Sequence, residues 1–370
     1  MIKVMSIFGT RPEAIKMAPL VKKLEEKEGI DSIVVITAQH REMLDQVLET
    51  FDIQPDYDLN IMKQGQTLTD ITIRTLKGLE TIIKESKPDI ILVHGDTTTT
   101  FVGALAAFYN QILIGHVEAG LRTYNKYSPW PEEMNRQMVD CMADMYFAPT
   151  DLSKKNLLNQ NINEEKIYVT GNTVIDAMSK TITKNYKHEI FDWLGDSRMI
   201  LLTVHRRENL GAPMRNIFKA IKRLVDEFED VKVVYPIHKN PQVRSIAYEI
   251  LKKNEKVKII EPLDVFDFHN FQNKSFIIMS DSGGVQEEAP SLGKPVLVLR
   301  NTTERPEGIK AGTLKLVGTD ENTIYNETRK LLTNQEEYDK MSKASNPYGD
   351  GRASEKIVDA IVKYFGDRLI

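Results

Sequence analysis

The chain has 370 residues, of which 41% are apolar and 28% charged, and its formal net charge is −4. This length exceeds the roughly 250–300 residues over which one hydrophobic core keeps growing, so we expect two domains. The weakly negative charge argues against nucleic acid and anionic membranes as partners, because a phosphate ligand then needs a local group of cations. No apolar run approaches the ~18 residues that span a bilayer, and the N-terminus runs directly into a strand, so we expect a cytoplasmic protein.

Residue types that often bind cofactors are sparse. The single cysteine, Cys141, excludes a disulfide within the chain and a multi-cysteine metal site. Its apolar neighbours predict a buried helix position rather than a catalytic thiol. The histidines lack H-x-x-x-H spacing, which argues against a zinc site, and neither G-x-G-x-x-G nor G-x-x-x-x-G-K-[ST] occurs, which disfavours a dehydrogenase and an ATPase.

Apolar runs alternate with helix-like stretches along the whole chain. A first series of predicted strands covers residues 3–8, 32–37, 90–94, 112–117 and 146–148, and a second covers 199–204, 231–235, 257–260, 276–279 and 295–299. Runs rich in Val, Ile and Leu without alternation are typical of parallel strands covered on both faces. We therefore predict an α/β fold with two doubly wound sheets, in domains 1–171 and 172–352, and a C-terminal helix over about 353–370 that packs back on the first domain.

In open α/β sheets, ligands bind beyond the carboxyl ends of the strands, so residues that follow strands are candidate site residues. Asp96, Glu118 and Glu132 lie at or near such ends in the first domain and are candidate acid–base groups. The structural alternatives are that Asp96 only caps a helix and that Glu132 only complements a helix dipole. Arg11 and Lys16 follow the first strand, and their alternatives are a structural ion pair and a solvated side chain.

The stretch from residue 277 to 305 predicts a strand, a glycine turn and a helix. Backbone N–H groups at a helix start bind anions, and the turn Ser282-Gly283-Gly284 allows a diphosphate to approach the backbone closely. Glu288 would then accept hydrogen bonds from a ribose diol, and Arg305 would contact phosphate. The alternative is a tight turn followed by a solvated helix face.

Histidines also follow strands in the second domain. His205 is a candidate phosphate ligand or general acid, and the alternative is an imidazole that bonds only to backbone groups. A second polar set, distinct from the carboxylates, comprises Gln39, His40, Gln66, Arg206 and His238.

Motifs over most of the chain, from Thr10 to Glu307, carry a specific resemblance. They read GTRPEAIKMAPL, TAQHREML, HGDTTTT, HVEAGLRT, SPWPEEMNR, GNTVID, VHRRENLG, YPIHKNP and DSGGVQEEAPSLGKPVLVLRNTTERPE. With these motifs the chain resembles the non-hydrolysing UDP-N-acetylglucosamine 2-epimerases. The resemblance implies a GT-B-like fold, in which two Rossmann-like domains face a central cleft, and a homodimer. It also implies interconversion of UDP-N-acetylglucosamine and UDP-N-acetylmannosamine without NAD or metal, in support of cell-surface polysaccharide or teichoic acid synthesis.

The resemblance also implies roles for individual residues. The catalytic groups would be Asp96, Glu118, Glu132 and His205. The substrate-binding groups would be Arg11, Lys16, Phe268, Ser282, Gly283, Gly284, Glu288 and Arg305. The residues of an allosteric site for UDP-N-acetylglucosamine would be Gln39, His40, Gln66, Arg206 and His238.

The chemistry of the reaction can be argued separately. The C2 hydrogen of an N-acetylhexosamine is not acidic, because no carbonyl group adjoins that carbon. Elimination of UDP to a 2-acetamidoglucal, followed by re-addition with protonation from the other face, inverts C2 and requires carboxylates on both faces of the sugar. A glycosyltransferase with the same UDP site, which would need an acceptor, and a UDP-sugar sensor without turnover are the alternatives.

Overall fold

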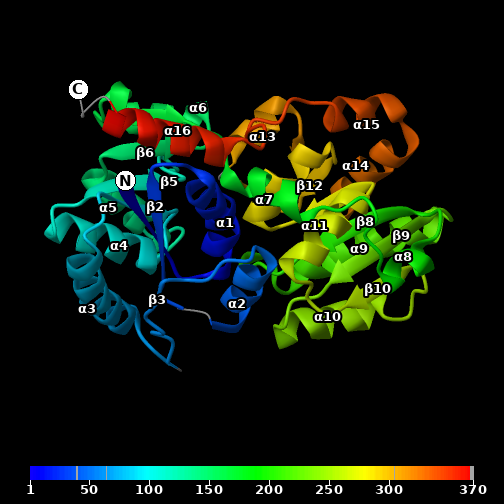
Figure 1. Ribbon diagram of the computed structural model, residues 1–370. Helices are drawn as coiled ribbons and strands as arrows, with labels where there is room; N and C mark the ends of the chain where they lie inside the picture. The colour runs from blue at the N-terminus through cyan, green and yellow to red at the C-terminus, as the bar shows by residue number, and fades with distance from the viewer. Residues whose placement is uncertain (39–40, 64, 304, 367–370) are drawn as a thin grey trace. The chain divides into compact units, whose positions relative to one another are not determined.

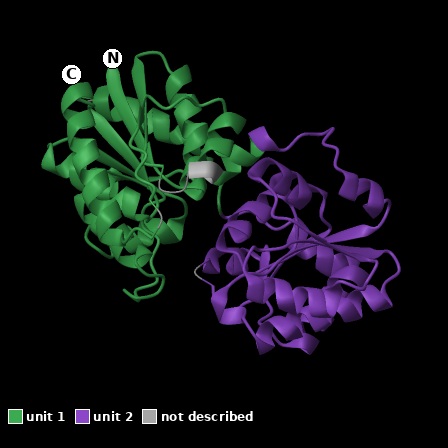
Figure 2. Cartoon of the chain, turned by 90° about the horizontal axis from the view of Figure 1, so that it is seen from below, with its two compact units in different colours: residues 1–179, 348–370 green, residues 180–347 purple. Residues whose placement is uncertain are grey.

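The computed structural model describes residues 1–38, 41–63, 65–303 and 305–366 (Figure 1). The chain forms two compact units, unit 1 with residues 1–179 and 348–370 and unit 2 with residues 180–347 (Figure 2). The border predicted after residue 171 lies just before helix α7 (Thr173–Thr181), most of which belongs to unit 1. Among the helices that the structure describes, none is both long and apolar enough to span a membrane.

Unit 1 contains a seven-stranded parallel sheet with the order β3-β2-β1-β4-β5-β6-β7. Its strands are β1 (Ile2–Phe8), β2 (Ile30–Ile36), β3 (Tyr57–Asp58), β4 (Ile90–His94), β5 (Leu113–Val117), β6 (Met145–Ala148) and β7 (Ile167–Val169). Its other helices are α1 (Arg11–Glu26), α2 (Arg41–Thr50), α3 (Leu68–Ser86), α4 (Thr98–Tyr109), α5 (Glu132–Met142), α6 (Asp151–Leu158), the short 3₁₀ helix η1 (Glu164–Lys166) and α16 (Ala353–Gly366).

The central strands of this sheet consist of apolar residues that helices cover. All five residues of β4 are buried, and Met5 and Ile7 of β1 pack in one apolar cluster with residues of α3 and α4. Strand β4 pairs with β1 on one side and with β5 on the other, so that His94 lies opposite Val117. Because the strands are parallel, the loops after β1, β4 and β5 meet at one edge of the sheet.

The C-terminal helix α16 belongs to unit 1 and packs against α1 (Figure 1). The Asp176 carboxylate of α7 accepts hydrogen bonds from the backbone N–H groups of Ala353 (3.1 Å) and Ser354 (2.8 Å). Backbone N–H groups in the first turn of a helix have no partner within the helix, so Asp176 caps α16. The chain enters this segment beside α7, where Asn172 N–H donates to the Tyr348 carbonyl at 2.7 Å.

Unit 2 contains a six-stranded parallel sheet with the order β10-β9-β8-β11-β12-β13. Its strands are β8 (Arg198–Thr203), β9 (Val231–Pro236), β10 (Val257–Ile260), β11 (Ile277–Ser280), β12 (Val296–Val298) and β13 (Leu314–Leu316). Its helices are α8 (Glu189–Leu194), η2 (Arg207–Asn209), α9 (Ala212–Glu227), α10 (Pro241–Leu251), α11 (Val265–Lys274), α12 (Gly283–Glu288), η3 (Ala289–Leu292), α13 (Pro306–Ala311), α14 (Glu321–Thr333) and α15 (Gln335–Ser342).

The predicted α/β class and every predicted strand are confirmed, with ends that differ by at most two residues. Strands β3, β7 and β13 were not predicted; they are edge strands of two or three residues. The prediction of a buried cysteine is wrong: Cys141 is exposed. Its helix α5 instead turns Val139 and Asp140 toward the interior, because only one face of a helix can pack on the sheet.

Candidate active site

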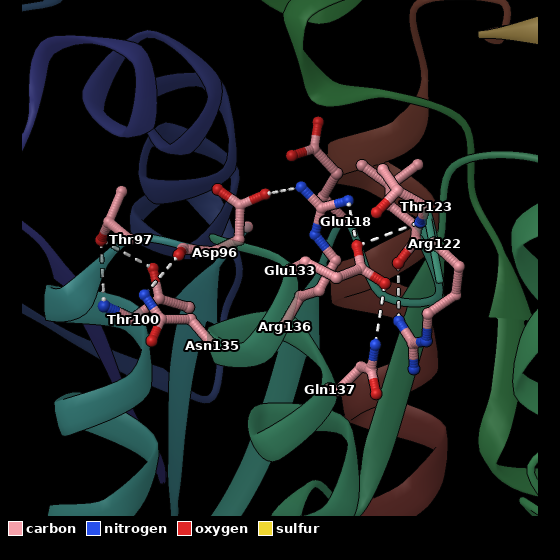
Figure 3. A network of polar contacts seen from close by, with 12 residues as sticks. Asp96, Thr97, Thr100, Glu118, Arg122, Thr123, Glu133, Asn135, Arg136 and Gln137 are labelled. Carbon is pink, nitrogen blue, oxygen red and sulfur yellow. Dashed lines mark hydrogen bonds and ion pairs between the residues drawn. The ribbon is translucent and has the colours of Figure 1, made fainter. Parts of the chain in front are cut away.

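Asp96 lies in the turn between β4 and α4, and helix α5 holds it from the side. The Asp96 carboxylate forms an ion pair with Arg136, and Asn135 Nδ2 donates to the Asp96 carbonyl at 2.9 Å (Figure 3). Burial raises the pKa of Asp96, and the charge of Glu118 acts in the same direction, while Arg136 and Lys16 oppose it. Asp96 is therefore a carboxyl group that can exchange a proton at a higher pH than an exposed aspartate.

Glu118 directly follows β5 and adopts a left-handed backbone conformation, with a φ of 69°. Its side chain is buried to about nine-tenths, forms an ion pair with Lys16 of α1, and accepts a hydrogen bond from Asn172 Nδ2 at 3.1 Å. A non-glycine residue in this conformation costs about 1–3 kcal/mol and persists only where its surroundings hold it. Lys16 is thus paired rather than solvated, whereas no ion pair joins Arg11 to another residue of the described ranges.

His94, the last residue of β4, lies beside Glu118 and was not predicted as a site residue. Its imidazole is 4% exposed, and its Nε2 is 3.9 Å from Glu118 Oε2. Neither ring nitrogen has a hydrogen-bond partner in the part of the chain that the structure describes. Burial lowers the pKa of His94 to about 3, so the ring is neutral at pH 7. Its place immediately before Gly95 and Asp96 was the signal that could have identified it.

The two acids at the start of α5 have different surroundings. Glu132, the predicted catalytic residue, is the first residue of α5 and half-buried, and its carboxylate forms no hydrogen bond or ion pair with any other residue that the structure covers. Glu133 is fully buried and accepts a hydrogen bond from the backbone N–H group of Thr123 at 3.0 Å (Figure 3). It also accepts one from the backbone N–H group of Tyr124 at 3.0 Å. Glu133, whose carboxylate is buried and hydrogen-bonded, was therefore not predicted as a site residue.

Glu13 of α1 joins two of the loops at this edge of the sheet. Its buried carboxylate accepts hydrogen bonds from the Gly9 and Thr10 N–H groups at 3.1 and 2.7 Å. It also accepts them from the Thr97 and Thr100 hydroxyls at 2.7 and 3.0 Å. Burial raises the pKa of Glu13, although these hydrogen bonds oppose the rise. Through Glu13, Thr97 and Thr100 thus connect the start of α4 to the loop that precedes α1.

A second buried network, formed by His116, Arg122 and Asp140, supports the turn between β4 and α4 that carries Asp96. His116 Nδ1 lies 2.6 Å from an oxygen of Asp140, and Arg122 Nη2 donates to the other oxygen at 2.6 Å. Burial alone would raise the pKa of Asp140, but His116 and Arg122 together lower it below its usual value. His116 Nε2 also contacts the Gly95 carbonyl at 2.8 Å, which fixes the residue before Asp96.

In unit 2 the predicted glycine turn lies against Arg305. Ser282 precedes α12, which begins at Gly283. A Cβ atom on Gly283 would be 2.9 Å from Arg305 Nη1, and one on Gly284 would be 3.3 Å from Glu288 Oε1. A side chain on Gly283 would therefore require the Arg305 guanidinium to move away from the turn.

The remaining predicted binding residues of unit 2 lie on α11 and α12. Glu288 accepts a hydrogen bond from Gln272 Nε2 at 2.6 Å, and His269 Nε2 is 3.9 Å from it. Phe268 is partly buried and packs against an apolar cluster of unit 2. Arg305 Nε donates to Glu287 Oε1 at 2.7 Å. Glu288 is therefore not the solvated acid of the structural alternative.

His205 follows β8 and is held by Asp281, which follows β11. The buried Asp281 carboxylate accepts the N–H groups of His205 and Arg206 at 3.0 and 2.9 Å and Asn209 Nδ2 at 2.9 Å. The His205 ring stacks on His238 with 5.5 Å between the centroids. Burial lowers the pKa of His205, and Asp281 opposes this effect.

The predicted allosteric set is divided between the units. Gln39 and His40 lie outside the described residues. Gln66 of unit 1 accepts a hydrogen bond from Arg74 Nη1 at 3.3 Å, while Arg206 and His238 of unit 2 both adjoin His205. Activation by the substrate stays a prediction. The residues covered by the structure contain no cluster of three or more His, Cys, Asp or Glu side chains that could hold a metal ion.

Comparison with known proteins identifies the family. The family model for UDP-N-acetylglucosamine 2-epimerase matches residues 22–362. The chain belongs to this family. The UDP-N-acetylglucosamine 2-epimerase of Bacillus subtilis (strain 168) is 63% identical over 367 residues, which cover 99% of this chain and 97% of that protein.

Solved structures of the epimerase family agree with this assignment. The Neisseria meningitidis UDP-GlcNAc 2-epimerase bound to UDP-GlcNAc is 50% identical, with a TM-score of 0.90 over 98% of this chain and 100% of that chain. The Staphylococcus aureus MnaA co-structure with UDP is 57% identical, with a TM-score of 0.92 over 99% of this chain and 97% of that chain. The fold of the chain is therefore that of the GT-B-type epimerases.

Proposed function

We propose that this protein interconverts UDP-N-acetylglucosamine and UDP-N-acetylmannosamine by inverting C2 of the sugar. The observation that carries this proposal is the similarity to the Neisseria meningitidis epimerase, which binds UDP-GlcNAc and is 50% identical along nearly the whole chain. A nucleotide sugar is thus the proposed substrate, and UDP is the part of it that leaves and returns.

The proposed reaction has two steps. A base takes the C2 proton while the bond between C1 and the diphosphate oxygen breaks, so that the electrons of the C2–H bond form a C1=C2 double bond and UDP leaves. UDP then adds back to C1, and an acid protonates C2 from the opposite face. This route needs no oxidant, because the carbon skeleton is neither oxidised nor reduced overall.

Asp96, Glu118 and Glu132 are the proposed acid–base groups. The raised pKa of Asp96 supports a role in which it holds a proton during part of the cycle. Glu118 is paired with Lys16, whose positive charge favours the ionised carboxylate, so it is suited to act as a base. Two carboxyl groups in different electrostatic surroundings can divide the tasks of acid and base.

The proposed ligands of UDP are Ser282, Gly283, Gly284, Glu288 and Arg305, with Arg11 and His205 as further contacts. A Gly284→Val variant tests this assignment, because its side chain would occupy the space in which a diphosphate approaches the backbone. We expect UDP affinity, measured by calorimetry, to fall at least about tenfold, as for the loss of one charge-assisted hydrogen bond. Gly366→Val is the matched control, since a Cβ atom there meets nothing within 4 Å. Equal affinities in the two variants would remove this turn from the UDP site.

The experiment that tests the activity is an incubation of the purified protein with UDP-N-acetylglucosamine in D₂O. We expect UDP-N-acetylmannosamine that carries deuterium at C2, and we expect Asp96→Asn and Glu118→Gln to reduce its rate of formation about 10²-fold or more. Glu132→Gln should reduce this rate by a similar factor if Glu132 is catalytic. A wild-type rate in this variant would mean that Glu132 only complements the dipole of α5. If no epimer forms without an acceptor, the epimerase proposal fails in favour of a glycosyltransferase.

A further inference from the structure

Arg136 lies between two carboxylates of unit 1. Its Nη2 forms an ion pair with Asp96, and its Nη1 donates to Glu133 Oε2 at 3.2 Å (Figure 3). The Arg136 side chain is only 9% exposed. A guanidinium is planar and presents its donors in fixed directions, so its contact with one carboxylate constrains where it can hold the other.

Glu133 is the fixed end of this arrangement. Its Oε2 accepts the Thr123 N–H and its Oε1 accepts the Tyr124 N–H, and Gln137 Nε2 donates to Oε1 at 2.8 Å. A fully buried carboxylate with these donors on both oxygens has one favourable orientation. The Glu133 carboxylate therefore binds backbone N–H groups and Arg136, and we assign it a structural role rather than an acid–base role.

Helix α5 also holds the main chain of Asp96. Asn135, the residue before Arg136, donates to the Asp96 carbonyl, so consecutive residues of one helix contact both the backbone and the carboxylate of the same aspartate. The orientation of the Asp96 carboxylate is therefore determined by α5 rather than by the β4–α4 turn alone.

We propose that Arg136 is a positioning residue for Asp96 in the epimerase reaction and that Glu133 is its anchor. This inference rests on the proposed function, in which Asp96 exchanges a proton with the sugar. A carboxylate misplaced by about 1 Å can lower a rate about 10²-fold, so loss of Arg136 should reduce turnover even with every acid–base group present.

Removal of Arg136 should also change the pH dependence. Three charged groups face Asp96 from the surrounding elements: Arg136 of α5, Glu118 after β5 and Lys16 of α1. Burial raises the pKa of Asp96, and Arg136 is the stronger of the two cations that lower it, so Arg136→Met raises this pKa further. Whether the reaction needs Asp96 protonated or ionised, the limb of the rate profile that it controls moves to higher pH.

The test compares Arg136→Met and Arg136→Lys with Arg215→Met, a matched control that breaks an exposed ion pair with Glu249. The rate of deuterium incorporation at C2 is measured in D₂O as a function of pH. For Arg136→Met we expect kcat to fall about 10²-fold, KM to change less than about threefold and one limb to move to higher pH. The control should match the wild type, and a uniform loss of rate at every pH in Arg136→Met would overturn the proposal.

Arg136→Lys keeps the positive charge but has a single ammonium group in place of the planar fork. We expect its kcat to fall at least about tenfold with an unchanged melting temperature and an unmoved pH limb, and a wild-type kcat would overturn the positioning role. This variant decides the question if Arg136→Met does not fold.

A second readout does not depend on activity. In protein labelled with [¹³Cγ]aspartate, the Asp96 signal is assigned through Asp96→Asn and titrated without substrate. A pKa of Asp96 that is no higher in Arg136→Met than in the wild type would overturn the proposal. Wild-type protein that incorporates no deuterium would instead refute the proposed function, and the titration would still report on Arg136.

Discussion

Asp281 fixes the loop that carries His205 and Arg206, so its replacement should destabilise unit 2. In Asp281→Asn, the amide oxygen can keep the Oδ2 position, where it accepts the Arg206 N–H and Asn209 Nδ2. The amide NH₂ group then faces the His205 N–H, which donates to both carboxylate oxygens in the wild type, at 3.1 and 3.0 Å. Loss of one charge-assisted hydrogen bond in a buried place should reduce the free energy of unfolding by about 1.5–3 kcal/mol.

Differential scanning calorimetry checks this value. For a unit of this size, 1 kcal/mol shifts the melting temperature by about 2–4 °C, so a loss of about 1.5–3 kcal/mol should move the transition of unit 2 down by about 3–12 °C. Asp226→Asn is the matched control, because Asp226 is a solvent-exposed residue of α9 that pairs with Lys222, and an exposed pair contributes little. A melting temperature of Asp281→Asn that equals that of the control would refute the account of this loop.

Two further variants test the support of the site in unit 1. Gly120→Ala should lower the free energy of unfolding, measured by chemical denaturation, by about 3 kcal/mol or more. Gly120 has a φ of 86°, and a Cβ atom there would be 2.3 Å from the Ser153 carbonyl oxygen. A variant as stable as the wild type would contradict this close approach. Asp140→Asn should lose the stabilisation that His116 and Arg122 provide by lowering the pKa of Asp140. That stabilisation is complete above the unfolded-state pKa of about 3.9 and disappears as the pH falls through the lower folded-state value, so the difference in unfolding free energy between wild type and variant should narrow below about pH 4. A difference that stays constant down to about pH 2 would argue against this ion network.

The strands that could be predicted are those with enough apolar residues to require burial on both faces. Strand β4, with the sequence IILVH, is an example, and all five of its residues are buried. Strands β3, β7 and β13 pair on one side only and contain two or three residues, so their sequences carry almost no periodic signal. Their existence depends on the neighbouring strand, which a local pattern cannot report.

The candidate site could be located from the sequence but not resolved into individual contacts. Glu132 and Glu133 are chemically identical neighbours, and which of them is buried depends on how α5 packs against the loop at Thr123 and Tyr124. His94 was predicted only as the last residue of the strand 90–94, and no role was assigned to it. Its two buried ring nitrogens without partners among the described residues became visible only in three dimensions.

Because α16 packs on unit 1, the two units can complete their folding in a different order from the one in which they are synthesised. Residues 180–347 form a continuous unit, whereas residues 1–179 lack the helix that packs on α1 until the ribosome has synthesised residues 353–366. All residues of unit 2 therefore leave the ribosome before α16 does, and the face of α1 that α16 covers stays open to chaperones until residues 353–366 have been synthesised. A stop codon that removes only the last turns of α16 would thus damage the unit that emerges first from the ribosome.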